Sequence, residues 1–167
     1  KNHISGNEIG RLWQEVMLDD LLKRISISKY KDNFILKGGL LLSAVVGINN
    51  RSTEDIDGEI KGFDLTEDEI EKVFTVICNT KPDNDPLEIV LTKIEKIHEN
   101  EEYKGFRLHS NASFKTIKYP LKVDISTGDV ITPREIHYNY MPHLEDEKIE
   151  IWAYNMETVT AEKLETV

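Results

Sequence analysis

The stretch "FILKGGLLLSAVVGINNRSTEDIDGEI", residues 34–60, decides the fold. It predicts a short buried strand that ends at Gly38 and Gly39, a helix that begins there, a loop, and a second strand that carries Asp55 and Asp57. A helix N-terminus has unpaired N–H groups and a partial positive charge, and glycine lets the backbone approach a phosphate closely. We therefore expect a triphosphate-binding turn at the glycines, although two adjacent glycines are also typical of a purely structural turn.

Asp55 and Asp57 are two residues apart on the second strand, so their side chains point to the same side of a sheet. Two carboxylates this close repel each other unless a cation neutralises them. Mg²⁺ prefers oxygen ligands and usually keeps substrate phosphates in its coordination shell. The spacing predicts a site for Mg²⁺ or Mn²⁺, with Ile56 pointing into the core between the two acids.

A second D-x-D pair, Asp83 and Asp85, occurs in "KPDNDPLE" at the same spacing. It lies between prolines, in a segment that reads as a turn. We therefore interpret this pair as part of a solvated loop, without a chemical role.

Asp124 is a third candidate carboxylate, inside the apolar strand pattern of "YPLKVDISTGD". An acid in such a strand needs a partner or a metal ion. Two interpretations remain open: Asp124 completes the cation site, or it is a buried aspartate paired with an arginine.

The pattern along the rest of the chain predicts an α+β fold, with a small mixed, mostly antiparallel sheet flanked by helices. The first helix is expected to pack on the core through Ile9, Leu12, Trp13, Val16, Met17 and Leu21. A capping box at Thr66 and Glu69 marks the start of another helix. Residues 132–135 are compatible with a helical turn or with a direct run into the next strand. The expected helices cover residues 7–28, 39–47, 65–80 and the chain from Met156, and the expected strands cover residues 34–37, 54–63, 87–97, 106–114, 119–129, 135–144 and 148–155.

Composition limits the class of protein. A length of 167 residues, 39% hydrophobic and 31% charged, fits one soluble domain, or one domain and part of another. No apolar run reaches the roughly 20 residues of a membrane helix. The single cysteine, Cys78, excludes an internal disulfide and fits a reducing, cytoplasmic setting.

The net charge of −10 argues against a broad nucleic-acid-binding face, but not against a local site where metal ions bridge phosphates. The sequence begins with lysine and ends inside a helical pattern, so we expect it to be a piece of a longer protein.

Four segments in this order, "LKGG", "RSTEDID", "LKVDIS" and "ETVTAEKL", resemble the AbiEii/AbiGii toxin family. Those proteins are nucleotidyltransferase-like toxins of abortive-infection toxin–antitoxin systems, in the DNA polymerase beta-like superfamily. The resemblance spans residues 35–167. It implies a minimal nucleotidyltransferase domain over residues 1–155 and the start of a helical C-terminal region at 156–167.

The resemblance also assigns roles to individual residues. Asp55, Asp57 and Asp124 would form a catalytic metal triad. The nucleotide would be held by Gly38, Gly39, Arg51, Ser52, Thr53 and Lys163, of which Lys163 would also be catalytic. The sequence departs from the family pattern at Leu40, which follows the glycines, at Gly58, which follows the D-x-D pair, and in the long spacing between these two motifs.

The function implied is metal-dependent transfer of a nucleotide from an NTP to an RNA such as a tRNA, or to a protein, by a toxin with an antitoxin partner and no membrane association. Two alternatives remain: a catalytically inactive binding module on this fold, and a kinase-like phosphotransferase. The five histidines show no zinc-ligand spacing. Tyr138 and Tyr140 alternate along a strand, which favours packing over a base-stacking role.

Overall fold

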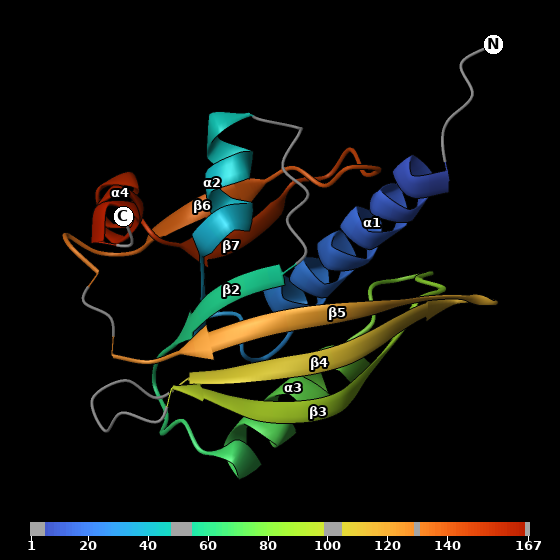
Figure 1. The fold of residues 1–167 in the computed structure, drawn as a ribbon, viewed down its shortest axis with the longest axis horizontal. Helices are drawn as coiled ribbons and strands as arrows, with labels where there is room; N and C mark the ends of the chain where they lie inside the picture. The colour runs from blue at the N-terminus through green and yellow to red at the C-terminus, as the bar shows by residue number, and fades with distance from the viewer. Residues whose placement is uncertain (1–5, 48–54, 99–104, 129–130, 166–167) are drawn as a thin grey trace.

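The computed structural model describes residues 6–47, 55–98, 105–128 and 131–165 of the chain (Figure 1). The predicted order of helices and strands is confirmed. The elements are α1 (Gly6–Ile27), β1 (Phe34–Lys37), α2 (Gly38–Val46), β2 (Asp55–Ile60), α3 (Glu67–Asn79), β3 (Glu88–His98), β4 (Gly105–Phe114), β5 (Ile117–Ser126), β6 (Ile136–Tyr140), β7 (Ile149–Ala153) and α4 (Met156–Glu165).

The strands form one seven-stranded sheet in the order β3-β4-β5-β2-β1-β7-β6. The β1–β7 and β2–β5 pairs are parallel, whereas the other neighbouring pairs are antiparallel. The predicted α+β class, with a mixed and mostly antiparallel sheet, is therefore confirmed. Residues 132–135 run into β6 without a helical turn, which settles the choice that the sequence left open.

Alternation along the strands gives the sheet one apolar and one polar face. In Figure 1, α1 and α3 lie behind the sheet, and no described helix lies in front of β3, β4 and β5. The apolar face forms the core. It includes Ile56, Phe106, Leu108, Leu121, Val123 and Ile125, all of which are buried. The acids of β2 and β5 consequently lie on the opposite face, which is partly open to solvent.

Only part of the predicted apolar stripe of α1 is buried. Met17 and Leu21 lie in the core, and Trp13 stacks on Phe114 with ring centroids 5.7 Å apart. The expected burial of Ile9 and Leu12 is wrong, since they are 46% and 44% exposed. The core therefore lies under the C-terminal half of the helix.

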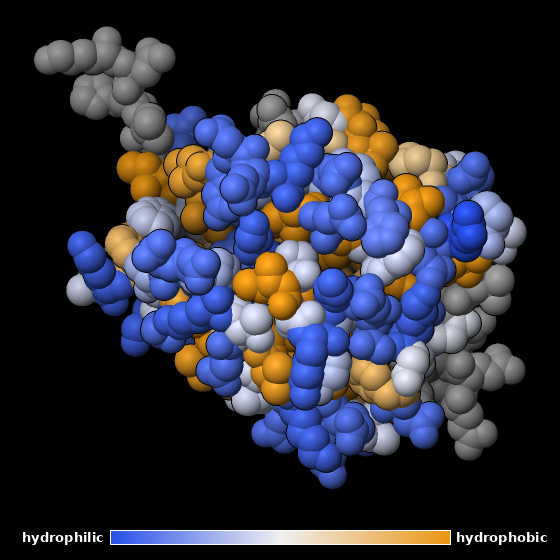
Figure 2. Space-filling view, turned by 180° about the vertical axis from the view of Figure 1, so that it is seen from behind, coloured by the Kyte–Doolittle hydropathy of each residue, from blue (hydrophilic) through white to orange (hydrophobic). Residues whose placement is uncertain are grey.

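Seen from behind, the surface of the molecule is mostly hydrophilic, with apolar side chains in separate small groups (Figure 2).

Helix α2 is buried only in part. Its first turn buries Leu40 and Leu41, but Val46 in its last turn is 53% exposed. The helix ends at Gly47, whose N–H donates to the carbonyl of Ser43 and whose φ of 71° is left-handed. None of the described helices combines the length and the apolar character needed to cross a membrane.

Core packing leaves no room for a side chain at Gly58. A Cβ atom at this position would lie 2.3 Å from the ring of Phe34, which is fully buried. A larger residue after the two aspartates would have to displace that ring. The departure from the family pattern at Gly58 is thus explained by the size of Phe34.

The prediction that Asp83 and Asp85 both belong to a solvated loop is wrong for Asp85. Arg24 is completely buried in α1, and its guanidinium donates to the carboxylates of Asp20 and Asp85. It also donates to the carbonyl oxygen of Leu87, at 2.7 Å. A buried guanidinium needs such partners because its desolvation is costly. Asp83 is exposed, as expected.

We expect Asp85→Ala to lower the free energy of unfolding by about 3 kcal/mol, because it leaves part of the buried Arg24 charge uncompensated. Asp83→Ala changes the same motif at an exposed position and should cost less than about 0.5 kcal/mol. Urea unfolding of both variants measures the difference. Equal stabilities would contradict a structural role for Asp85.

Candidate functional site

Five charged side chains lie in register across five neighbouring strands. Lys37 of β1 is paired with Asp57 of β2, which is paired with Asp124 of β5. Asp124 is paired in turn with Arg107 of β4, and Arg107 with Glu95 of β3. We call these five residues the charged row. Pairing register fixes the face of every strand, so the row is a direct product of the sheet topology.

Asp57 lies against the start of α2. Gly38 has a left-handed φ of 70°, and a Cβ atom there would lie 2.1 Å from Oδ2 of Asp57. The backbone N–H of Gly39 donates a hydrogen bond to the Asp57 carboxylate. The side chain of Lys37, the N-cap residue, makes no capping hydrogen bond. The glycine pair therefore brings a carboxylate and a helix N-terminus together.

The surroundings of Asp57 disfavour its negative charge. Burial raises the pKa of Asp57, and the charge of Asp124 raises it further. The N–H of Gly39 opposes these effects, and more weakly so does Lys37, while Asp55 adds to the increase. Burial is the largest of these effects, so the pKa of Asp57 is raised first by its loss of solvent and then by its acidic neighbours.

Asp124 is held by an arginine. Nε of Arg107 donates to Oδ1 at 2.8 Å, and Nη2 donates to Oδ2 at 2.7 Å. This confirms the interpretation of an aspartate paired with an arginine. It does not confirm burial in the core, since the Arg107 and Asp124 side chains are 38% and 19% exposed. The two-point contact raises the pKa of Arg107, so the guanidinium remains charged.

The donor set fits a divalent cation only in part. Asp55 precedes Asp57 by two residues on β2, and both offer the oxygen ligands that Mg²⁺ prefers. Nζ of Lys122 lies 3.9 Å from Oδ1 of Asp55. Within the described ranges, no group of three or more acids, histidines or cysteines is arranged to hold a metal ion. Asp124 directs both of its oxygens to Arg107, so the predicted triad remains a prediction.

A cavity of about 350 Å³ lies beside Asp57 and is lined by the start of α2 and by α4. Lys163 therefore lies on the same cavity as the glycine pair, although it is far away in the sequence. Its predicted contact with a nucleotide stays a prediction. Arg51, Ser52 and Thr53 lie outside the described residues. The lining residues are Lys37, Gly38, Gly39, Asp57, Val159, Glu162, Lys163 and Glu165.

Sequence reasoning missed Lys37 and Arg107. Nζ of Lys37 donates to Oγ of Ser126 at 2.8 Å and lies 3.8 Å from Oε1 of Glu162. Lys37 directly precedes the glycines, which was a signal that the strand could deliver a cation to the site. Arg107 gave no such signal, because its contact with Asp124 depends on the register of two long strands.

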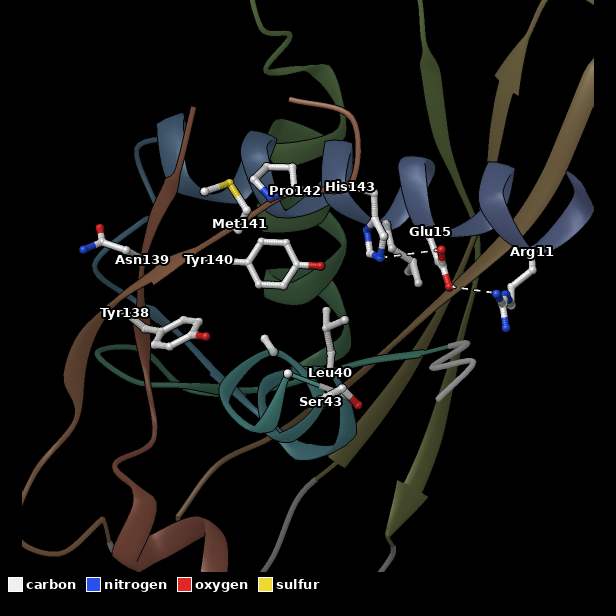
Figure 3. Close-up of a pocket in the computed structure, with 13 residues that line it drawn as sticks. Arg11, Glu15, Leu40, Ser43, Tyr138, Asn139, Tyr140, Met141, Pro142 and His143 are labelled. Carbon is white, nitrogen blue, oxygen red and sulfur yellow. Dashed lines mark ion pairs between the residues drawn. The ribbon is translucent and has the colours of Figure 1, made fainter. Parts of the chain in front are cut away.

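A second cavity, of about 510 Å³, lies between α1, α2 and the end of β6 (Figure 3). It shares no lining residue with the cavity beside Asp57. Tyr140 is buried and donates to Oδ1 of Asp19 at 2.7 Å, which confirms its predicted packing role. Figure 3 shows Glu15 between His143 and Arg11, an arrangement that links α1 to the chain after β6.

We expect Gly38→Ala to cost more stability than Gly47→Ala. Both residues have a φ near 70°, so each variant pays about 1 kcal/mol of backbone strain. Gly47 has no described atom within 4 Å of an added Cβ, whereas Gly38 has the Asp57 carboxylate. Gly38→Ala should therefore lose about 1–3 kcal/mol more. Equal losses in urea unfolding would show that Asp57 does not pack against the glycine.

Two solved structures from Helicobacter pylori share the fold. One is provisionally described as a nucleotidyltransferase, with a TM-score of 0.52 and 16% identity over 96% of this chain and 59% of that chain. The other is JHP933, with a TM-score of 0.54 and 18% identity over 97% of this chain and 58% of that chain. The chain thus spans less than two thirds of the length of either.

The sequence has no match among curated proteins. Residues 20–167 match the family described as "Nucleotidyl transferase AbiEii toxin, Type IV TA system". That match takes in the glycine pair, the three aspartates and Lys163. The chain belongs to the AbiEii nucleotidyltransferase toxin family.

Proposed function

We propose that this chain carries the catalytic site of a metal-dependent nucleotidyltransferase. The observation that carries the proposal is the register of Asp57 and Asp124 on neighbouring parallel strands, beside a helix that begins with two glycines. Family membership supports the reaction class. It also supports action as the toxin of a toxin–antitoxin pair, with an antitoxin protein as partner.

The NTP would place its phosphates between the start of α2 and α4. The N-terminus of α2 carries a partial positive charge that attracts anions, and Lys37 and Lys163 border the same cavity. At about 350 Å³ the cavity lies in the range of small-ligand sites. Lys163 would offset negative charge that develops on the phosphates during transfer.

Asp55 and Asp57 would hold the divalent cation, Mg²⁺ or Mn²⁺, and Asp124 is the third candidate ligand. When bound, such a cation neutralises phosphate charge and lowers the pKa of a hydroxyl that attacks phosphorus. Asp124 can help to deprotonate the acceptor only with an oxygen that Arg107 has released.

An RNA end, such as that of a tRNA, is one candidate acceptor. The polar face of β3–β5 next to the charged row carries Lys93, Arg107, His109 and Lys122, and in Figure 1 none of the described helices lies in front of it. Each of these side chains lies within ion-pair distance of an acid on the same face, so this face is polar with charges of both signs. A protein hydroxyl is the second candidate acceptor.

One observation favours an alternative function. The two-point contact between Arg107 and Asp124 satisfies the third carboxylate without a cation, as expected of an inactive binding module on this fold. A module of this kind would bind no NTP, so calorimetry with NTP and Mg²⁺ separates the two functions.

The proposed function is tested by incubation of the protein with α-³²P-labelled NTPs, Mg²⁺ and total RNA or a protein extract. We expect label to enter a macromolecule with release of pyrophosphate. Asp57→Asn should lower the rate by on the order of 100-fold or more, because it removes a charge that the transition state needs. Asp83→Asn, an exposed acid of the other D-x-D pair, serves as the control and should retain the rate.

Transfer from γ-labelled NTP with release of NDP would instead indicate a phosphotransferase. Absence of transfer with each of the four NTPs, together with absence of NTP binding, would contradict the proposal and favour the inactive module. Undiminished transfer by Asp57→Asn would show that the site lies elsewhere.

A further inference from the structure

We propose that Arg107 regulates the cation site. Asp124 joins Asp55 and Asp57 around a divalent cation only after it gives up its two-point contact with the guanidinium of Arg107. The inference rests on the proposed function, because it concerns the cation that the function requires. It assigns a role to a residue that no family motif quoted above contains.

The position of Arg107 allows it to compete with a cation for the Asp124 carboxylate. It lies directly opposite Asp124 in the antiparallel β4–β5 pair, so both side chains leave the sheet on the same face. Its Nε and Nη2 atoms occupy one oxygen each, at 2.8 and 2.7 Å. The guanidinium takes one lone pair of each oxygen and places a positive charge beside the carboxylate, so a metal ion would have to bind Asp124 against that charge.

Arg107 can leave without a large cost to the fold. Its side chain is 38% exposed and lies on the polar face, away from the core. Its other acidic neighbour in the charged row is Glu95, in register on β3. Glu95 accepts hydrogen bonds from Lys93 and from Nε2 of His109, which lowers its pKa to about 2 and keeps it ionised. A displaced guanidinium therefore meets a negative charge.

The contact between Arg107 and Asp124 also accounts for a second observation. Within the described residues, Asp55, Asp57 and Asp124 are not arranged around a metal ion, because Asp124 is turned to Arg107. Asp57 and Asp124 are neighbours across the β2–β5 pair, and their charges repel. Arg107 neutralises Asp124 from the far side, which reduces that repulsion. A cation between the two acids would perform the same task, so the two positive groups compete for one carboxylate.

The test is a titration with Mn²⁺ alone, in which the unbound ion is followed by electron paramagnetic resonance at fixed pH and salt. We expect Arg107→Gln to tighten Mn²⁺ binding by on the order of tenfold, given the usual size of coupling between contacting residues. Arg107→Lys keeps the charge but loses the fork, so it should tighten binding by a smaller factor. Thermal unfolding of each variant verifies that it is folded.

The Asp124→Asn background separates competition from a general effect of charge. If Arg107 acts through Asp124, then Arg107→Gln should change Mn²⁺ affinity little in that background. An equal gain in both backgrounds would overturn the proposal, as would unchanged or weaker binding by Arg107→Gln in the otherwise native chain. Failure of every variant to bind Mn²⁺ would overturn the cation site itself, and the proposed function with it. Loss of the Arg107 effect alone would leave that function intact.

Discussion

The pairing of β2 with β5 is the constraint on which the candidate site depends. It sets Asp57 beside Asp124, and the neighbouring pairs extend the line to Lys37 on one side and Arg107 on the other. A shift of one residue in β5 would turn Asp124 into the core and bring Val123 to the polar face. The buried side chains of Leu121, Val123 and Ile125 oppose such a shift, so the hydrophobic core enforces the register of the charged row.

The negative charges of Asp57 and Asp124 repel each other across neighbouring strands, and three interactions at the site reduce this unfavourable energy. The N–H of Gly39 donates to Asp57, Lys37 lies beside it in the row, and Arg107 binds Asp124. The raised pKa of Asp57 shows that these contributions do not fully balance burial and repulsion. In the function that we propose, a divalent cation would contribute to this balance, and its affinity would depend on how firmly Arg107 is held.

The fold, the helix start at Gly38 and Gly39, and the strand with Asp55 and Asp57 were all predictable from the sequence. Each depends on a local signal: the spacing of apolar residues, a glycine pair, or two acids two residues apart. The sequence did not predict Arg107 as the partner of Asp124, since that contact requires the register of β4 on β5. For the same reason it misassigned Asp85, whose partner Arg24 is 61 residues away. In each case a tertiary contact decided the role of a carboxylate, and spacing alone contained no information about it.

We propose that a divalent cation binds at Asp55 and Asp57, beside the start of α2. Amide NMR spectra recorded with substoichiometric Mn²⁺ test it most directly, because a bound paramagnetic ion broadens the nearest signals. The account predicts that Gly38, Gly39 and Asp57 broaden first. Broadening centred on another acidic segment, such as the first turn of α3 with Glu67, Asp68 and Glu69, while the signals of Gly39 and Asp57 stay sharp, would contradict it.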